Sequence, residues 1–254
     1  MTSWPFQRDL VLRPSRAAGA LSSEPAFPSA VWVFLSYLLV SALFHAWKPF
    51  DFPPLPGNAM LEPPPGGSAF WMSVQVWQIP LAGLGVLLTG WFAKRLSGEK
   101  LPRLLLGSIG CALIPLLLLV VYVNTRMPRP LFGLLWLGLC SLLWPGLRSV
   151  DRAAWKPLAA WMLGINAVPL ALTPLAVLLV LLRAAPLYQA LEYGMAFWML
   201  GLATYGVSRL FRLPAARAFC AVFLAMICEI LCLFGLYFLG LVGKPVLSVL
   251  LLSL

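Results

Sequence analysis

Charged side chains are scarce in this sequence. Only 10% of its 254 residues are Asp, Glu, Lys or Arg, whereas 61% are hydrophobic. Soluble domains are nearer half apolar and a quarter charged, so a soluble core cannot accommodate this surplus of apolar side chains. The composition therefore excludes an ordinary soluble domain.

Histidine is almost absent, which limits the chemistry available to the chain. His45, the single histidine, is expected to be an interfacial side chain near the end of an apolar run. Intramembrane proteases need a Ser and His pair, or clustered Glu and His on facing helices, and neither pattern occurs. No phosphate-binding loop, dinucleotide fingerprint or zinc-ligand spacing is present either. We therefore expect no enzyme activity and no cofactor.

The five cysteines give no disulfide framework, because all of them lie inside apolar runs. There they are expected to behave as small hydrophobic residues. Cys228 and Cys232 are one helical turn apart, but two thiols without a third ligand make a poor metal site. We therefore expect no metal centre.

Long apolar runs dominate what remains. Each holds roughly 17 to 26 residues, and about 20 residues in a helix cross the 30 Å hydrocarbon core of a bilayer. We predict an all-α, polytopic transmembrane helix bundle of about seven spans. The predicted spans are residues 30–47, 69–93, 104–123, 131–147, 157–182, 191–210 and 215–240.

The basic residues predict the orientation of these spans. The net charge of +10 is spread over short loops, which argues against a nucleic-acid partner and for a topology signal. With the N-terminus in the cytoplasm, 13 of the 18 Lys and Arg residues fall on the cytoplasmic side. If the short fourth span failed to cross, the split would be 9 to 9, so the seven-span topology is favoured.

The same analysis divides the chain into three parts. Residues 1–29 are predicted to be a cytoplasmic amphipathic segment, and residues 30–241 the transmembrane domain. The apolar tail, residues 242–254, reaches only about 20 Å as a helix, so it should lie in the interface or pack on the bundle. Arg outnumbers Lys, as in GC-rich bacterial genomes, which suggests the inner (plasma) membrane.

Glu229 is the most informative single residue, because a charged carboxylate in mid-span costs about 2.5 to 3.5 kcal/mol. Counting along the helices places Gln75 and Gln78 at a comparable depth in the second span. Two interpretations stay open. The three side chains form a proton-titrating or cation-binding site, or Glu229 is a protonated group hydrogen-bonded for packing.

Two further sets of polar residues are candidates. Asn166 lies in the fifth span before Pro169, where freed carbonyls coordinate an ion or the helix is simply kinked. Four basic residues of the loop after the second span are candidates for binding anionic lipid headgroups, although topology explains them equally well. They are Lys94, Arg95, Lys100 and Arg103.

Three stretches share a pattern of small, proline and basic residues. Residues 12–25 are an amphipathic, proline-marked lead-in to the first span. Residues 96–103 contain a glycine and a short polar turn, and a span with Pro115 follows them. Residues 205–218 are a last inner turn that leads a small and a basic residue into the final helix. These stretches resemble the bacterial branch of the Yip-one domain family, the Ypt-interacting-protein-like membrane proteins, and residues 131–182 add a helical hairpin to that family's usual five spans.

This resemblance implies a non-enzymatic membrane protein, and we expect a membrane-organising or scaffold subunit. Its expected partners are membrane lipids, anionic ones among them, and a membrane protein or a second copy of the chain. The alternative is a small transporter or channel component centred on Glu229. Eukaryotic relatives bind small GTPases through a longer N-terminal segment, so that partner is not expected here.

Overall fold

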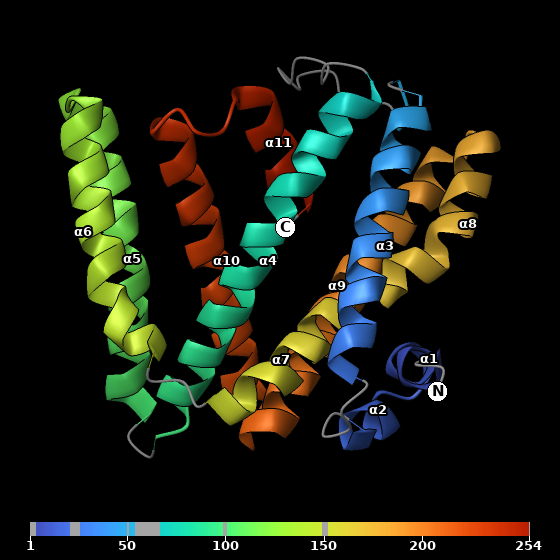
Figure 1. The fold of residues 1–254 in the computed structure, drawn as a ribbon, viewed down its shortest axis with the longest axis horizontal. Coiled ribbons are helices and arrows are strands. Elements are labelled where there is room, and N and C mark those ends of the chain that lie inside the picture. The colour runs from blue at the N-terminus through green and yellow to red at the C-terminus, as the bar shows by residue number, and fades with distance from the viewer. Residues whose placement is uncertain are drawn as a thin grey trace. The chain divides into compact units, whose positions relative to one another are not determined.

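The computed structural model describes residues 4–20, 26–49, 51–53, 67–98, 101–148 and 152–253, and within these ranges every regular element is an α-helix (Figure 1). The predicted all-α class is confirmed. The helices are α1 (Trp4–Leu12), α2 (Pro14–Ala20), α3 (Ala26–Trp47), α4 (Ser68–Leu96), α5 (Leu101–Thr125), α6 (Arg129–Arg148), α7 (Arg152–Gly164), α8 (Ala167–Leu181), α9 (Ala185–Phe211), α10 (Ala215–Phe238) and α11 (Lys244–Ser253).

Four helical segments of the described ranges are long and apolar enough to cross a membrane. They are Ala26–Trp47, Ser68–Leu96, Ala154–Leu181 and Ala215–Phe238. Apolar helices are favoured here because the backbone of a helix satisfies its own hydrogen bonds, as a hydrocarbon environment requires. The structure therefore supports a membrane protein. Each of the seven predicted spans lies on a helix or a helix pair, but the count of seven stays a prediction, because α9, which carries the predicted sixth span, is not among the four.

The predicted fifth span is interrupted between α7 and α8, at Ile165 and Asn166. Pro169 explains the position of the break, because proline lacks an N–H group and its ring clashes with the carbonyl four residues earlier, that of Ile165. The Ile165 carbonyl instead accepts a hydrogen bond from the Val168 amide at 3.0 Å. The chain thus continues in the same span with a local break.

Contacts between Cα atoms divide the chain into two compact units. Unit 1 comprises residues 1–79 and 156–206, and unit 2 comprises residues 80–155 and 207–254. Each unit is therefore assembled from two separate stretches of sequence. The predicted division at residues 29 and 241 does not coincide with these boundaries and stays a prediction.

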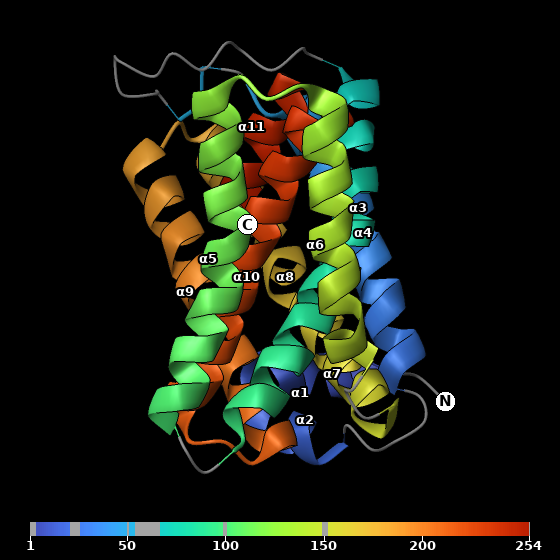
Figure 2. The same cartoon turned by 90° about the vertical axis from the view of Figure 1, so that its left-hand side faces the viewer.

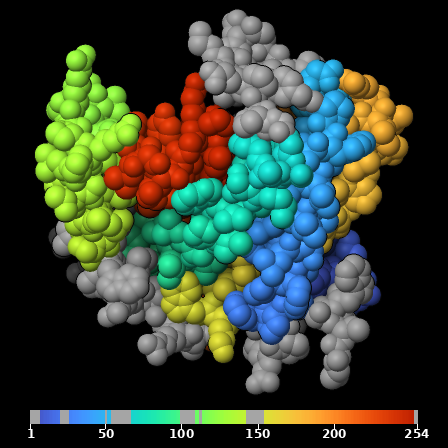
Figure 3. All heavy atoms as spheres, turned by 45° about the horizontal axis from the view of Figure 1, so that its top comes forward, coloured from blue at the N-terminus to red at the C-terminus, as the bar shows by residue number. Residues whose placement is uncertain are grey.

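In unit 1, α3 packs against α8, and the short helices α1 and α2 lie at the end where α3 begins (Figure 1). Leu10 of α1 and Ala17 of α2 are fully buried, and Gln7 donates a hydrogen bond to the Ser29 hydroxyl at 2.9 Å. The first part of α4 lies beside α3 in Figure 3, where α3 is blue and α4 cyan. The N-terminal segment is thus docked on the helices of its own unit.

In unit 2, α10 packs against α5, and α5 and α6 form a hairpin (Figure 2). Phe132 and Trp136 of α6, Leu119 of α5 and Leu231 of α10 form its buried cluster. A Cβ atom at Gly235 would overlap the Trp136 ring, so only glycine allows α10 to approach α6 this closely. The tail helix α11 packs against α10.

Three interhelical turns share one construction. Arg126, Arg183 and Arg212 follow the last turn of α5, α8 and α9, and each has a positive φ, of 50°, 52° and 53° respectively. A left-handed residue at this position lets the helix's last carbonyls find partners, and a proline follows within three residues in every case. These arginines therefore end their helices locally.

Candidate functional site

Glu229 is buried inside unit 2, with 7% of its surface exposed. It projects from α10 towards α4, where a Cβ atom at Gly85 would lie 2.9 Å from the Glu229 Oε2 atom. The carboxyl group therefore fills the space that the absent side chain of Gly85 leaves against the helix backbone. This glycine was not singled out by sequence reasoning, because nothing local marks Gly85 apart from the other glycines of the span.

The buried residues of α10 beside Glu229 are apolar or cysteine. Cys228 is also buried, and Leu231 and Leu224 complete the apolar surface of α10. Among the described residues, no three His, Cys, Asp or Glu side chains cluster as metal ligands.

Gln75 and Gln78 belong to unit 1, at the start of α4. Gln75 is buried and donates a hydrogen bond to the Ser41 hydroxyl of α3 at 3.2 Å. Its Oε1 atom has no hydrogen-bond partner within the described ranges. Glu229 belongs to the other unit, so the predicted polar layer of these three residues stays a prediction.

Ser41 connects Gln75 to a line of polar groups along α3. The Tyr37 hydroxyl is hydrogen-bonded to Ser41, and the His45 Nδ1 atom lies 2.8 Å from the Ser41 carbonyl oxygen. The His45 ring also packs against the Trp71 ring of α4, with 4.8 Å between centroids and 32° between the ring planes. Sequence reasoning missed this line, although Tyr37, Ser41 and His45 are spaced four residues apart and so share one helical face.

A second polar cluster of unit 1 joins the end of α3 to α8 and α9. Arg183 donates a hydrogen bond to the Asp51 carboxylate at 2.8 Å, and this contact lowers the pKa of Asp51. The ammonium group of Lys48 lies 5.1 Å from the centre of the Tyr188 ring. Burial lowers the pKa of Lys48, and the nearby Glu192 carboxylate opposes that shift.

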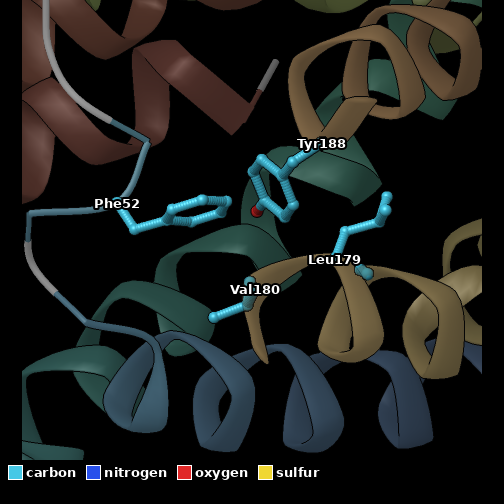
Figure 4. Close-up of a cluster of buried hydrophobic side chains, with 5 residues drawn as sticks. Phe52, Leu179, Val180 and Tyr188 are labelled. Carbon is cyan, nitrogen blue, oxygen red and sulfur yellow. The ribbon is translucent and has the colours of Figure 1, made fainter. Parts of the chain in front are cut away.

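Apolar packing fixes this cluster in place. The rings of Phe52 and Tyr188 pack edge to face, with 5.2 Å between their centroids, beside Leu179 and Val180 of α8 (Figure 4). The Tyr188 hydroxyl donates a hydrogen bond to Glu192, four residues later in α9. These contacts hold the segment after α3 against the turn between α8 and α9.

The other predicted site residues that the structure describes make contacts close to them in the sequence. The Asn166 amide donates to the Leu163 carbonyl at 3.0 Å, across the break between α7 and α8. Arg95 stacks over the Trp91 ring at 5.4 Å, and Lys94 is exposed at the end of α4. Lys100 lies outside the described residues, as does the side chain of Arg103. Their predicted role in binding lipid headgroups stays a prediction.

Comparison of the chain with protein-family models, curated proteins and solved structures found no match. The resemblance to the Yip-one family therefore stays a prediction.

Proposed function

We propose that this chain is a multi-pass protein of the cell's inner membrane that crosses it seven times, with its N-terminus in the cytoplasm. The coincidence of the predicted spans with helices supports the crossings, and the 13 to 5 distribution of basic residues supports the orientation. Reporter fusions in each loop test it. A periplasmic signal from residues 148–156 would contradict the topology.

Within that membrane the chain acts as a Yip-like, non-enzymatic scaffold that associates with lipids and with a membrane-protein partner or a second copy. The observation that carries this proposal is the outward apolar face of the α5–α6 hairpin. Leu134 and Leu137 of α6 are 68% and 65% exposed, and Leu117 of α5 is 61% exposed. Such a face is covered by lipid tails or by the helix of a partner.

Photo-crosslinking in native membranes tests the scaffold role. A photoreactive residue at Leu134 or Leu137 should give protein adducts of defined size, whereas one at Trp136, which is 5% exposed, should give none. Mass spectrometry then distinguishes a second copy from another protein. If both outward positions yield only lipid adducts, the scaffold proposal is wrong.

A second candidate function is transport, in which Glu229 exchanges a proton or binds a cation. The contact between Glu229 and Gly85 favours it, because the buried carboxyl occupies a space left by glycine rather than a surface position. Purified protein in liposomes should then show a pH-dependent flux that Glu229→Gln abolishes. A protein that gives no flux above empty liposomes would argue against transport.

A further inference from the structure

A groove of about 410 Å³ runs along unit 1 between α8 and α9. Every residue that lines it is apolar or glycine, with Ala171 and Leu172 on α8, Gly194 and Trp198 on α9, and Val11 of α1 at its side. Small-molecule sites commonly have volumes of roughly 300 to 1,000 Å³, so the groove is large enough for a ligand.

Small side chains create this groove. Ala171 and Gly194 stand where a larger residue would fill the gap between the two helices, and a Cβ atom at Gly194 would meet no other atom within 4 Å. The groove therefore offers mainly apolar contact to an occupant.

The segment beside the groove carries positive charge. Val11 of α1 lines the groove, and Leu12 next to it is 70% exposed. Arg13 follows the end of α1 and Arg16 lies in α2, and both are exposed. Residues 4–20 contain three arginines and one acid, Asp9, which lies 3.5 Å from Arg8. A short helix with exposed leucine and arginine beside buried residues is typical of a segment that lies in the membrane interface.

We propose that this groove binds one acyl chain of an anionic phospholipid, whose phosphate group is held by Arg13 and Arg16. The apolar lining accommodates the chain, and the arginines beside Val11 provide the opposite charge for the headgroup. This inference rests on the proposed membrane location and deepens the lipid-binding role of the scaffold.

Native mass spectrometry of the delipidated full chain tests the proposal, with phosphatidylglycerol and phosphatidylcholine as the added lipids. The chain should bind one phosphatidylglycerol more tightly than one phosphatidylcholine. Replacing both arginines, as Arg13→Gln with Arg16→Gln, should remove that preference, a loss of about 30-fold for two lost charge contacts. Equal affinity for the two lipids in the unchanged protein would overturn the proposal.

Groove filling tests where the acyl chain binds. Gly194→Leu should weaken binding of both lipids at least ~10-fold, since the new side chain occupies the groove. Gly201→Leu is the matched control, because Gly201 lies in the same helix and also has open space around it. If Gly194→Leu fails to fold, Ala171→Leu fills the groove from α8. Tight lipid binding by a folded groove-filled variant would overturn the proposal.

Membrane extraction separates this inference from the function on which it rests. If alkaline carbonate releases the chain from membranes, the proposed membrane function fails together with the lipid site. If the chain stays in the membrane but shows no preference for phosphatidylglycerol, only the lipid site is wrong.

Discussion

Gly85 and Glu229 are complementary across α4 and α10, because the carboxyl group lies where a side chain at residue 85 would be. Gly85→Leu should therefore displace the carboxyl and lower the free energy of unfolding by about 1 to 3 kcal/mol, as overpacking does. Gly83→Leu is the control, since a Cβ atom there meets nothing within 4 Å. The measurement is thermal unfolding in detergent.

A compensating substitution makes that test specific. Glu229→Ala removes the carboxyl group that a leucine at residue 85 would displace. Gly85→Leu should therefore lower the free energy of unfolding less in the Glu229→Ala protein than in the unchanged protein. If Gly83→Leu and Gly85→Leu lower the free energy of unfolding equally, the carboxyl group of Glu229 does not depend on the space at Gly85.

Trp161 and Gly206 form a second close contact, in unit 1. Trp161 donates its indole N–H to the Leu202 carbonyl at 2.8 Å, which holds the ring against Gly206. A Cβ atom at residue 206 would overlap the ring. Gly206→Ala should therefore destabilise the protein by about 1 to 3 kcal/mol, despite the better helix propensity of alanine.

Gly201→Ala is the control for this contact, because it makes the same chemical change five residues away in open space. It should be neutral or slightly stabilising, since alanine favours a helix over glycine. Similar unfolding temperatures for the two variants would show that the Trp161 ring moves aside easily.

Acid should weaken the contact between Asp51 and Arg183. The pKa of Asp51 is lowered by its hydrogen bond with Arg183, so its contribution to stability is present above the ordinary aspartate pKa of about 3.9. That contribution is lost as the pH falls through the lowered pKa. Asp51→Asn should thus lower the unfolding temperature at pH 7 and have little effect at strongly acidic pH.

The matched variant Arg183→Gln removes the same contact from its other side and should show the same dependence on pH. Both groups are largely exposed, so high salt should also reduce the difference in unfolding temperature between each variant and the unchanged protein. A difference in unfolding temperature that persists unchanged into strong acid would contradict this prediction.

Arg217 caps α4 from the first turn of α10. Its Nη1 atom donates to the Leu96 carbonyl at 3.2 Å and to the Gly98 carbonyl at 2.9 Å. Arg217→Met keeps the apolar stem and should cost about 1 to 2 kcal/mol, because the last carbonyls of α4 lose a charged donor. Arg217→Lys should recover only part of this loss. Equal stability of the Met variant and the unchanged protein would show that water replaces the cap.

The positions of the helices were largely predictable from the sequence, because each long apolar run must satisfy its own backbone. Their ends were less so. α3 begins at Ala26, four residues before the predicted start at residue 30, although its first turn contains Pro28. Proline is tolerated there because the first N–H groups of a helix have no partner within it.

The contacts of the candidate sites were not predictable in the same way. Glu229 is conspicuous in a sequence because its charge is rare in an apolar run, whereas Gly85 is one of 20 glycines. The pairing of Asp51 with Arg183 joins residues 132 positions apart. Such partners are chosen by tertiary packing, which no local pattern encodes.

The assembly of each unit from two distant stretches has a consequence for biosynthesis. Unit 1 needs residues 156–206, so α3 leaves the ribosome long before its partner α8 has been translated. At about 5 to 20 residues per second, that interval lasts on the order of ten seconds. During this time α3 has only α1 and the start of α4 as partners within its unit, so a nascent chain arrested before α8 leaves exposed the face of α3 that α8 later covers.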